Sequence, residues 1–156
     1  MIFRFAINVG IALYLASILW VGAAPLNGEE FPPPGKYINI GKHHLHLHCI
    51  GQGSPTVILD AGLGGTSLEW VLVQPDVAQF TRVCSYDRSG YGWSEGIPGP
   101  RTSAIIVKEL QKLLDFADEQ SPYLLVGHSF GGLSMRLFAS HHPDKIAGLV
   151  LSLIHI

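Results

Sequence analysis

The stretch Leu124-Leu125-Val126-Gly127-His128-Ser129-Phe130-Gly131-Gly132-Leu133 decides how this chain folds. An apolar run ends at Gly127, and a helical pattern of apolar residues follows Gly132. Between them Gly127, Ser129 and Gly131 form the pattern Gly-x-Ser-x-Gly. A serine on such a strand-to-helix turn has strained backbone angles and holds its hydroxyl away from the sheet. Glycines two positions before and after the serine leave room for this turn.

This turn predicts that Ser129 is a catalytic nucleophile. The helix that follows points its N-terminus at the site, which favours developing negative charge, and the backbone N–H of Phe130 is the predicted oxyanion donor. A second donor should come from the loop after an earlier strand. Asp60-Ala61-Gly62-Leu63-Gly64-Gly65 is such a loop, and the N–H of Leu63 is the candidate. The alternative for this loop is an ordinary glycine-rich turn.

Outward from this stretch, strand and helix patterns alternate. Apolar or alternating runs predict strands over residues 44–50, 56–59, 82–86, 123–126 and 146–151. Amphipathic spacing predicts helices over 106–117 and 133–142, with Thr102 or Ser103 capping the first, and a partly helical segment over 68–80. This alternation indicates an α/β fold with a parallel sheet covered on both faces.

The N-terminal part has a different composition. Across the whole chain, hydrophobic residues make up 47% and charged residues 14%, which argues against disorder. The net charge of −2 argues against nucleic-acid binding. Residues 5–24 form an uncharged run of about 20 residues, long enough to cross a bilayer. Residues 1–25 are therefore predicted to be a membrane anchor, with Arg4 on the cytoplasmic side and the domain extracytoplasmic. A cleaved signal of a secreted protein and a buried core helix are the alternatives. Residues 26–36 read as a stiff proline-rich linker.

The C-terminal hexapeptide Leu-Ser-Leu-Ile-His-Ile, residues 151–156, has no cap, turn or polar tail. It matches the in-frame translation of CTGTCTCTTATACACATC, a transposase end sequence used in DNA-sequencing libraries. We therefore expect residues 151–156 to be translated adapter, with the first one or two coinciding with the natural chain. A natural apolar terminus is the alternative.

Four segments, taken in order, carry a family resemblance. They are SPTVILDAGLGG, VCSYDRSGYGWSE, YLLVGHSFGGLSMRLFA and HPDKIAGLVL, spread over residues 35–150. Together they resemble the N-terminal half of an α/β-hydrolase-fold protein of the esterase and proline-iminopeptidase-like branch. The resemblance implies an incomplete, mostly parallel sheet with helices on both faces, formed by residues 37–150. It also implies that Ser129 is the nucleophile, with Phe130 and Leu63 as oxyanion donors. Ala61 departs from the histidine found there in many members.

The same resemblance implies a triad in the order serine, acid, histidine, which this chain does not complete. Asp144 is the single acid after Ser129, and it lies too close in sequence to return to the site. We therefore expect the acid and the base to be absent from this chain. The expected function is a serine hydrolase that cleaves an ester or amide bond of a small substrate without metal or cofactor. The alternative is a non-catalytic binding protein of the same fold or an inactive fragment.

Pattern and resemblance predict roles for several further residues. Trp93 and His128 are predicted to line the substrate pocket, and Asp87-Arg88 to form a structural turn at the rim of the site. The alternating histidines His44, His46 and His48 are expected to form a solvated strand face rather than a metal site. Cys49 and Cys84 lie on strands that neighbour each other in this fold, and two free thiols are slightly favoured over a disulfide.

Overall fold

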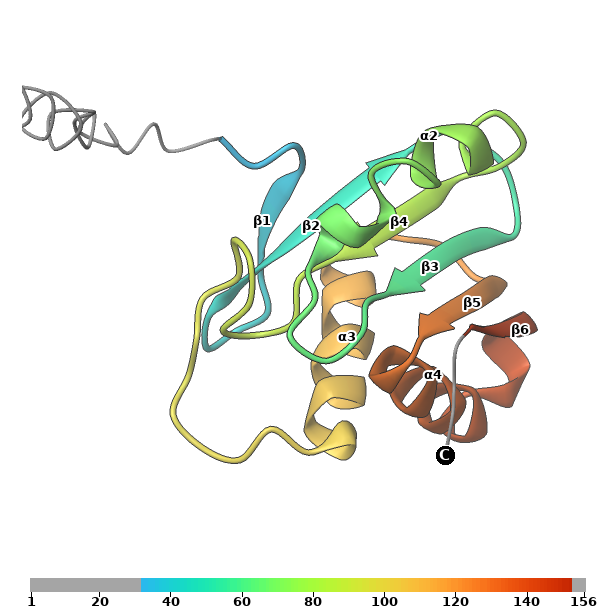
Figure 1. The fold of residues 1–156 in the computed structure, drawn as a ribbon. Coiled ribbons are helices and arrows are strands. Elements are labelled where there is room, and N and C mark those ends of the chain that lie inside the picture. The colour runs from blue at the N-terminus through green and yellow to red at the C-terminus, as the bar shows by residue number, and fades with distance from the viewer. Residues whose placement is uncertain (1–31, 153–156) are drawn as a thin grey trace, which may run out of the picture. The chain divides into compact units, whose positions relative to one another are not determined.

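A computed structural model of the protein describes residues 32–152 (Figure 1). Within this range six strands form one sheet in the order β1-β2-β4-β3-β5-β6. The strands are β1 (Lys36–Asn39), β2 (His44–Ile50), β3 (Thr56–Asp60), β4 (Val83–Tyr86), β5 (Tyr123–His128) and β6 (Ile146–Ser152). The helices are α2 (Gln74–Val77), α3 (Ser103–Phe116) and α4 (Phe130–His141), together with the 3-10 turns η1 (Ser67–Trp70) and η2 (Pro143–Lys145).

The sheet is mixed, and its parallel part lies where the site was predicted. Strands β4, β3, β5 and β6 run parallel to one another, whereas β2 pairs antiparallel with both β1 and β4. The five strands predicted from the sequence are present, each within two residues of its expected bounds. Strand β1 was missed because its four residues lie on the sheet edge and are mostly exposed, so they carry no alternating pattern.

Helices cover both faces of the sheet, as the sequence predicted. One face packs against α3 and α4 around Ile58, Leu125, Leu110 and Phe138. The opposite face packs against η1 and α2 around Val57, Leu59 and Trp70. Successive residues of β3 therefore point to alternate cores, which is why this strand reads as a continuous apolar run. Figure 1 shows α2 on one side of the sheet and α3 on the other.

Helix α3 begins where its capping residue was expected. The hydroxyl of Thr102 accepts a hydrogen bond from the N–H of Ile105 at 3.4 Å. Leu110, Leu113 and Leu114 are fully buried on the sheet-facing side. Because these leucines recur at helical spacing on one side of α3, they pack α3 against the same face of the sheet as α4.

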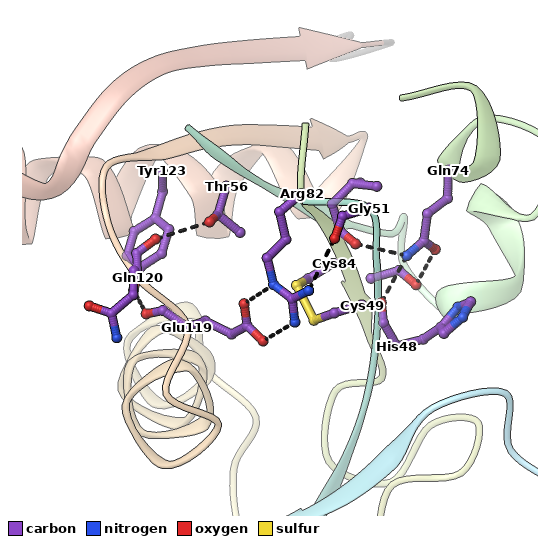
Figure 2. Close-up of a disulfide and its surroundings, with 12 residues drawn as sticks. His48, Cys49, Gly51, Thr56, Gln74, Arg82, Cys84, Glu119, Gln120 and Tyr123 are labelled. Carbon is purple, nitrogen blue, oxygen red and sulfur yellow. Dashed lines mark hydrogen bonds and ion pairs between the residues drawn. A yellow bond between two sulfur atoms is a disulfide. The ribbon is translucent and has the colours of Figure 1, made fainter. Parts of the chain in front are cut away.

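A disulfide joins Cys49 on β2 to Cys84 on β4 (Figure 2). The expectation of two free thiols was therefore wrong. The two cysteines are direct register partners in an antiparallel pair, with Cα atoms 4.1 Å apart, and this brings their sulfur atoms together. Beside the bridge, the guanidinium of Arg82 makes two 2.6 Å hydrogen bonds to the carboxylate of Glu119, which ties the start of β4 to the segment after α3.

We expect this bridge to stabilise the fold measurably. Because it closes a loop with a sequence separation of 35 residues, replacing both cysteines by serine is expected to lower the free energy of unfolding by about 2–4 kcal/mol. Urea unfolding of the oxidised protein, the reduced protein and the double variant measures the effect. The reduced protein should match the double variant. An unfolding midpoint that is the same with and without reductant would contradict this expectation.

The two chain ends lie mostly outside the described residues. The predicted anchor or signal at 1–25 and most of the linker at 26–36 fall there, as do residues 153–156. Within residues 32–152, no helix is long and apolar enough to cross a membrane. Strand β1 begins at Lys36, one residue before the expected domain boundary. Leu151 and Ser152, the first two residues of the C-terminal hexapeptide, pair with β5 as the end of β6.

Candidate active site

Ser129 lies on a sharp turn between β5 and α4, at the carboxyl edge of the parallel strands. Its backbone angles are φ 50° and ψ −116°, which are strained for a residue with a side chain. Its N–H donates to the carbonyl of Ser152 at 2.9 Å, which fixes the turn to β6. The N–H of Phe130 follows as the first of helix α4, where backbone N–H groups have no intrahelical acceptor. This is the geometry that the Gly-x-Ser-x-Gly pattern predicted.

The two glycines of the pattern are required by packing. A Cβ atom on Gly131 would lie 2.3 Å from the carbonyl oxygen of Asp60, and one on Gly127 would lie 2.5 Å from the Cα of Gly132. Both distances are far below van der Waals contact, and the nearby atoms belong to the backbone. The N-terminus of α4 therefore rests directly on the ends of β3 and β5.

The loop after β3 lies beside this turn. Asp60, the last residue of β3, is the register partner of Gly127 on β5, so the loop leaves the sheet next to Ser129. Gly64 adopts φ 77°, and the N–H of Gly65 donates to the carbonyl of Gly62 at 3.1 Å to close the loop. The predicted donors, Leu63 and Phe130, thus belong to neighbouring segments at one edge of the sheet.

Arg88 is buried beneath this loop and holds it from below. Its Nη1 donates to the carboxylate of Asp60 at 2.6 Å and to the carbonyl of Ala61 at 2.7 Å, and its Nη2 donates to the carbonyl of Gly62. Burial raises the pKa of Asp60 to about 6, because it outweighs the opposing effect of the Arg88 charge. The sequence predicted a structural turn at Asp87-Arg88, but it did not predict that Arg88 binds Asp60, Ala61 and Gly62.

His128 and Glu69 form a second contact beside the turn. The Nδ1 of His128 lies 3.1 Å from Oε2 of Glu69, and the same carboxylate oxygen accepts from the N–H of Gly62 at 3.1 Å. His128 therefore points across the loop rather than toward the buried core. Its predicted place in a substrate pocket stays a prediction. Glu69 was missed because it is one acid in a short turn without a recognisable pattern.

Asp87 organises the rim of the site. Its carboxylate accepts from the N–H groups of Ser67 at 2.6 Å and Trp93 at 3.1 Å and pairs with Nδ1 of His46 at 3.0 Å. Burial acts to raise the pKa of Asp87, but the hydrogen bonds from His46, Ser67 and Trp93 outweigh it and lower the pKa. The structural role expected for Asp87 is confirmed. The pocket role of Trp93, whose ring lies 5.0 Å from that of His46, stays a prediction.

One expectation about the histidines was wrong. His46 is fully buried, so the three alternating histidines do not form a solvated face. His44 and His46 pair with different carboxylates, Glu95 and Asp87. The alternation was read correctly as one side of a strand, but the loop after β4 covers that side at His46.

Among the described residues, the acid and the histidines that follow Ser129 in sequence lie far from its hydroxyl, at the opposite end of the sheet and of α4. Asp144 precedes Ile146, which pairs with Tyr123 at the start of β5, whereas Ser129 follows the end of β5. A six-residue strand separates the two positions by about 20 Å. His141 lies in the last turn of α4, about 18 Å along the helix from Ser129. These groups do not reach the Ser129 hydroxyl.

Comparisons with known proteins agree with this architecture. A family model described as the alpha/beta hydrolase fold matches residues 55–155. The uncharacterized protein YqjL of Bacillus subtilis is 36% identical over 104 residues, which cover 67% of this chain and 41% of the relative. The crystal structure of a hydrolase from Pseudomonas aeruginosa is 30% identical with a TM-score of 0.68, over 74% of this chain and 44% of that one. An enol-lactonase from Burkholderia xenovorans is 26% identical with a TM-score of 0.68, over 73% and 45%.

The chain belongs to the alpha/beta hydrolase fold family. It spans less than half of the length of each of these three relatives.

Proposed function

We propose that the protein is a serine hydrolase that cleaves an ester or amide bond of a small substrate through an acyl-enzyme on Ser129. The observation that carries this proposal is the strained φ of 50° at Ser129, held between β5 and α4 by glycines that packing requires. Strain of this kind is retained at functional sites because it positions a reacting group. The hydrolase and the enol-lactonase among the similar structures support the same reaction class.

The proposed reaction has two steps. The Oγ of Ser129 attacks the substrate carbonyl carbon, its proton passes to a histidine base, and the carbonyl oxygen becomes an oxyanion that accepts from the N–H groups of Leu63 and Phe130. The oxyanion then collapses, and the alcohol or amine leaves with that proton. In the second step water attacks the acyl-enzyme in the same way, which releases the acid and restores the hydroxyl.

The base and its partner acid are not supplied by Asp144 or His141, which lie at the far end of the sheet and of α4. The proposal therefore places both in sequence downstream of residue 150. A serine without such a base is a weak nucleophile at neutral pH. Activity is thus proposed for the protein expressed from its intact gene.

A fluorophosphonate probe tests the proposal, because it forms a covalent bond to an activated serine with loss of fluoride. We expect the wild-type protein from the intact gene to carry one adduct, on the peptide that contains Ser129, and the Ser129→Ala variant to carry none. Ser134→Ala is the matched control, because Ser134 lies on the same helix but is fully buried. An adduct on another serine, or equal labelling of Ser129→Ala, would overturn the proposal in favour of a non-catalytic protein.

The proposal includes attachment to a membrane through residues 5–24, with the domain on the extracytoplasmic side, and secretion after cleavage as the alternative. The Cys49–Cys84 disulfide supports either form, since disulfides persist in oxidising compartments and are rare in the cytosol. Fractionation of cells that express the intact gene separates the two: an anchored protein sediments with membranes, and a secreted one is recovered from the medium.

A further inference from the structure

Arg88 contacts both segments that carry the predicted oxyanion donors. Its guanidinium donates to the carbonyls of Ala61 and Gly62, the two residues that precede Leu63. The same guanidinium lies 5.5 Å from the ring centre of Phe130, the residue that carries the other donor. Arg88 is 4% exposed, so these contacts are made away from solvent.

The arrangement of these contacts restricts how the loop can move. A planar guanidinium presents its donors in a fixed fork, so carbonyls bound to two of its nitrogens are held at a set separation. The carboxylate of Asp60 binds the same guanidinium at 2.6 Å and fixes its position at the end of β3. The rings of Tyr91 and Phe130, each 5.5 Å from the guanidinium, complete its surroundings. The carbonyl of Gly62 and the N–H of Leu63 belong to one planar peptide group, so the bond from Arg88 to this carbonyl also sets the direction of the Leu63 N–H.

A second arginine shows what a purely structural ion pair looks like in this fold. Arg82 makes two hydrogen bonds to the carboxylate of Glu119 and one to the carbonyl of Gly51. It lies at the opposite end of β4, and its partners belong to no predicted site segment. Arg88 differs because two of its acceptors are main-chain carbonyls in the loop of residues 60–65, which carries the predicted donor Leu63.

We propose that Arg88 is a positioning residue for hydrolysis, which holds the Leu63 N–H and the Phe130 N–H in the separation and direction that an oxyanion requires. This inference rests on the proposed function. It adds a residue that does not touch the substrate and that acts through the loop of residues 60–65. Loss of one oxyanion donor typically lowers kcat by about 10²–10³-fold, so misplacing the Leu63 N–H is expected to lower kcat by about 10²-fold.

The test compares Arg88→Lys with Arg82→Lys in the protein from the intact gene. Lysine keeps the charge beside Asp60, but a single ammonium cannot reproduce the fork that spans Ala61 and Gly62. We measure kcat and KM for p-nitrophenyl acetate, and the inhibition constant of a trifluoromethyl ketone, whose adduct with serine is tetrahedral and bears an oxyanion. In Arg88→Lys, kcat and the affinity for the ketone should fall together by about 10²-fold, with KM within a few-fold of wild type. In Arg82→Lys all three should stay near wild type.

The outcomes separate this inference from the function on which it rests. If wild-type protein hydrolyses the ester, Ser129→Ala does not, and Arg88→Lys retains the kcat and ketone affinity of Arg82→Lys, the positioning role is wrong and the proposed function stands. If Ser129→Ala hydrolyses as fast as wild type, both fall. A drop in the folded fraction of Arg88→Lys without a change in ketone affinity per folded molecule also overturns the positioning role.

Phe130→Leu supplies the test if Arg88→Lys does not accumulate as folded protein. This variant removes the ring beside the guanidinium and leaves every hydrogen bond of Arg88 in place. Because a cation–ring contact shielded from solvent corresponds to an effect of about 30-fold, kcat and ketone affinity should both fall, by up to that factor. Unchanged values of both would contradict the proposed link between Arg88 and the Phe130 segment.

Discussion

Replacement of Ser129 by alanine is expected to lower kcat for ester hydrolysis by about 10⁶-fold in the protein from the intact gene, the loss typical of removing a serine nucleophile. The loss is this large because the proposed reaction forms its acyl bond on Ser129 Oγ, and alanine has no atom that can form this bond. Residual hydrolysis should come from substrate binding and the backbone donors alone. Steady-state assays with p-nitrophenyl acetate measure the change, after correction for spontaneous hydrolysis.

The backbone at Ser129 provides a control that separates catalysis from stability. At φ 50° and ψ −116° a residue with a side chain is strained, whereas glycine is not. Ser129→Gly should therefore be as inactive as Ser129→Ala but should unfold at higher denaturant concentration, with a gain of about 1–3 kcal/mol. Full activity in either variant would show that the nucleophile lies elsewhere. Inactivity together with lower stability in Ser129→Gly would show that the turn is not strained.

Replacement of Gly131 by alanine is expected to lower the free energy of unfolding by about 3 kcal/mol, the upper part of the range for overpacking. The added Cβ would lie 2.3 Å from the carbonyl oxygen of Asp60 and 2.6 Å from that of Ala61. Both oxygens belong to backbone that is fixed by β3 and by Arg88, so neither can withdraw cheaply. Helix α4 must move instead, which also displaces the N–H of Phe130.

Gly96→Ala is the matched control for this variant. A Cβ on Gly96 would lie 3.4 Å from its nearest neighbour, the Cα of Gly90, which is an ordinary contact. Guanidinium unfolding followed by circular dichroism should show a lower midpoint for Gly131→Ala and little change for Gly96→Ala. Equal midpoints for the two variants would mean that α4 does not rest on β3 as described.

The sequence was most informative where one backbone conformation was required. The turn at Ser129 and its position between a strand and a helix could be predicted because Gly127 and Gly131 allow few other arrangements. The buried strands could be predicted because residues on both of their faces are apolar, as at Val57 and Ile58. Strand β1 could not, because it is short and mostly exposed.

The remaining errors concern contacts between segments far apart in the chain. The disulfide depends on the register that places Cys49 opposite Cys84, which no local pattern specifies. The burial of His46 depends on Asp87, 41 residues later. Arg88 and Glu69 were not assigned to the loop of residues 60–65 for the same reason. Each binds a backbone group of Gly62, and a backbone acceptor or donor leaves no mark in the sequence.

The hydrogen bond from the N–H of Ser129 to the carbonyl of Ser152 has a consequence for synthesis on the ribosome. The acceptor is a main-chain oxygen, so any residue type at position 152 can supply it. Its strand is the last described element to be translated, and the nucleophile turn therefore stays without this anchor while β6 is still inside the exit tunnel. The turn at Ser129 therefore gains this hydrogen bond only after β6 has left the ribosome.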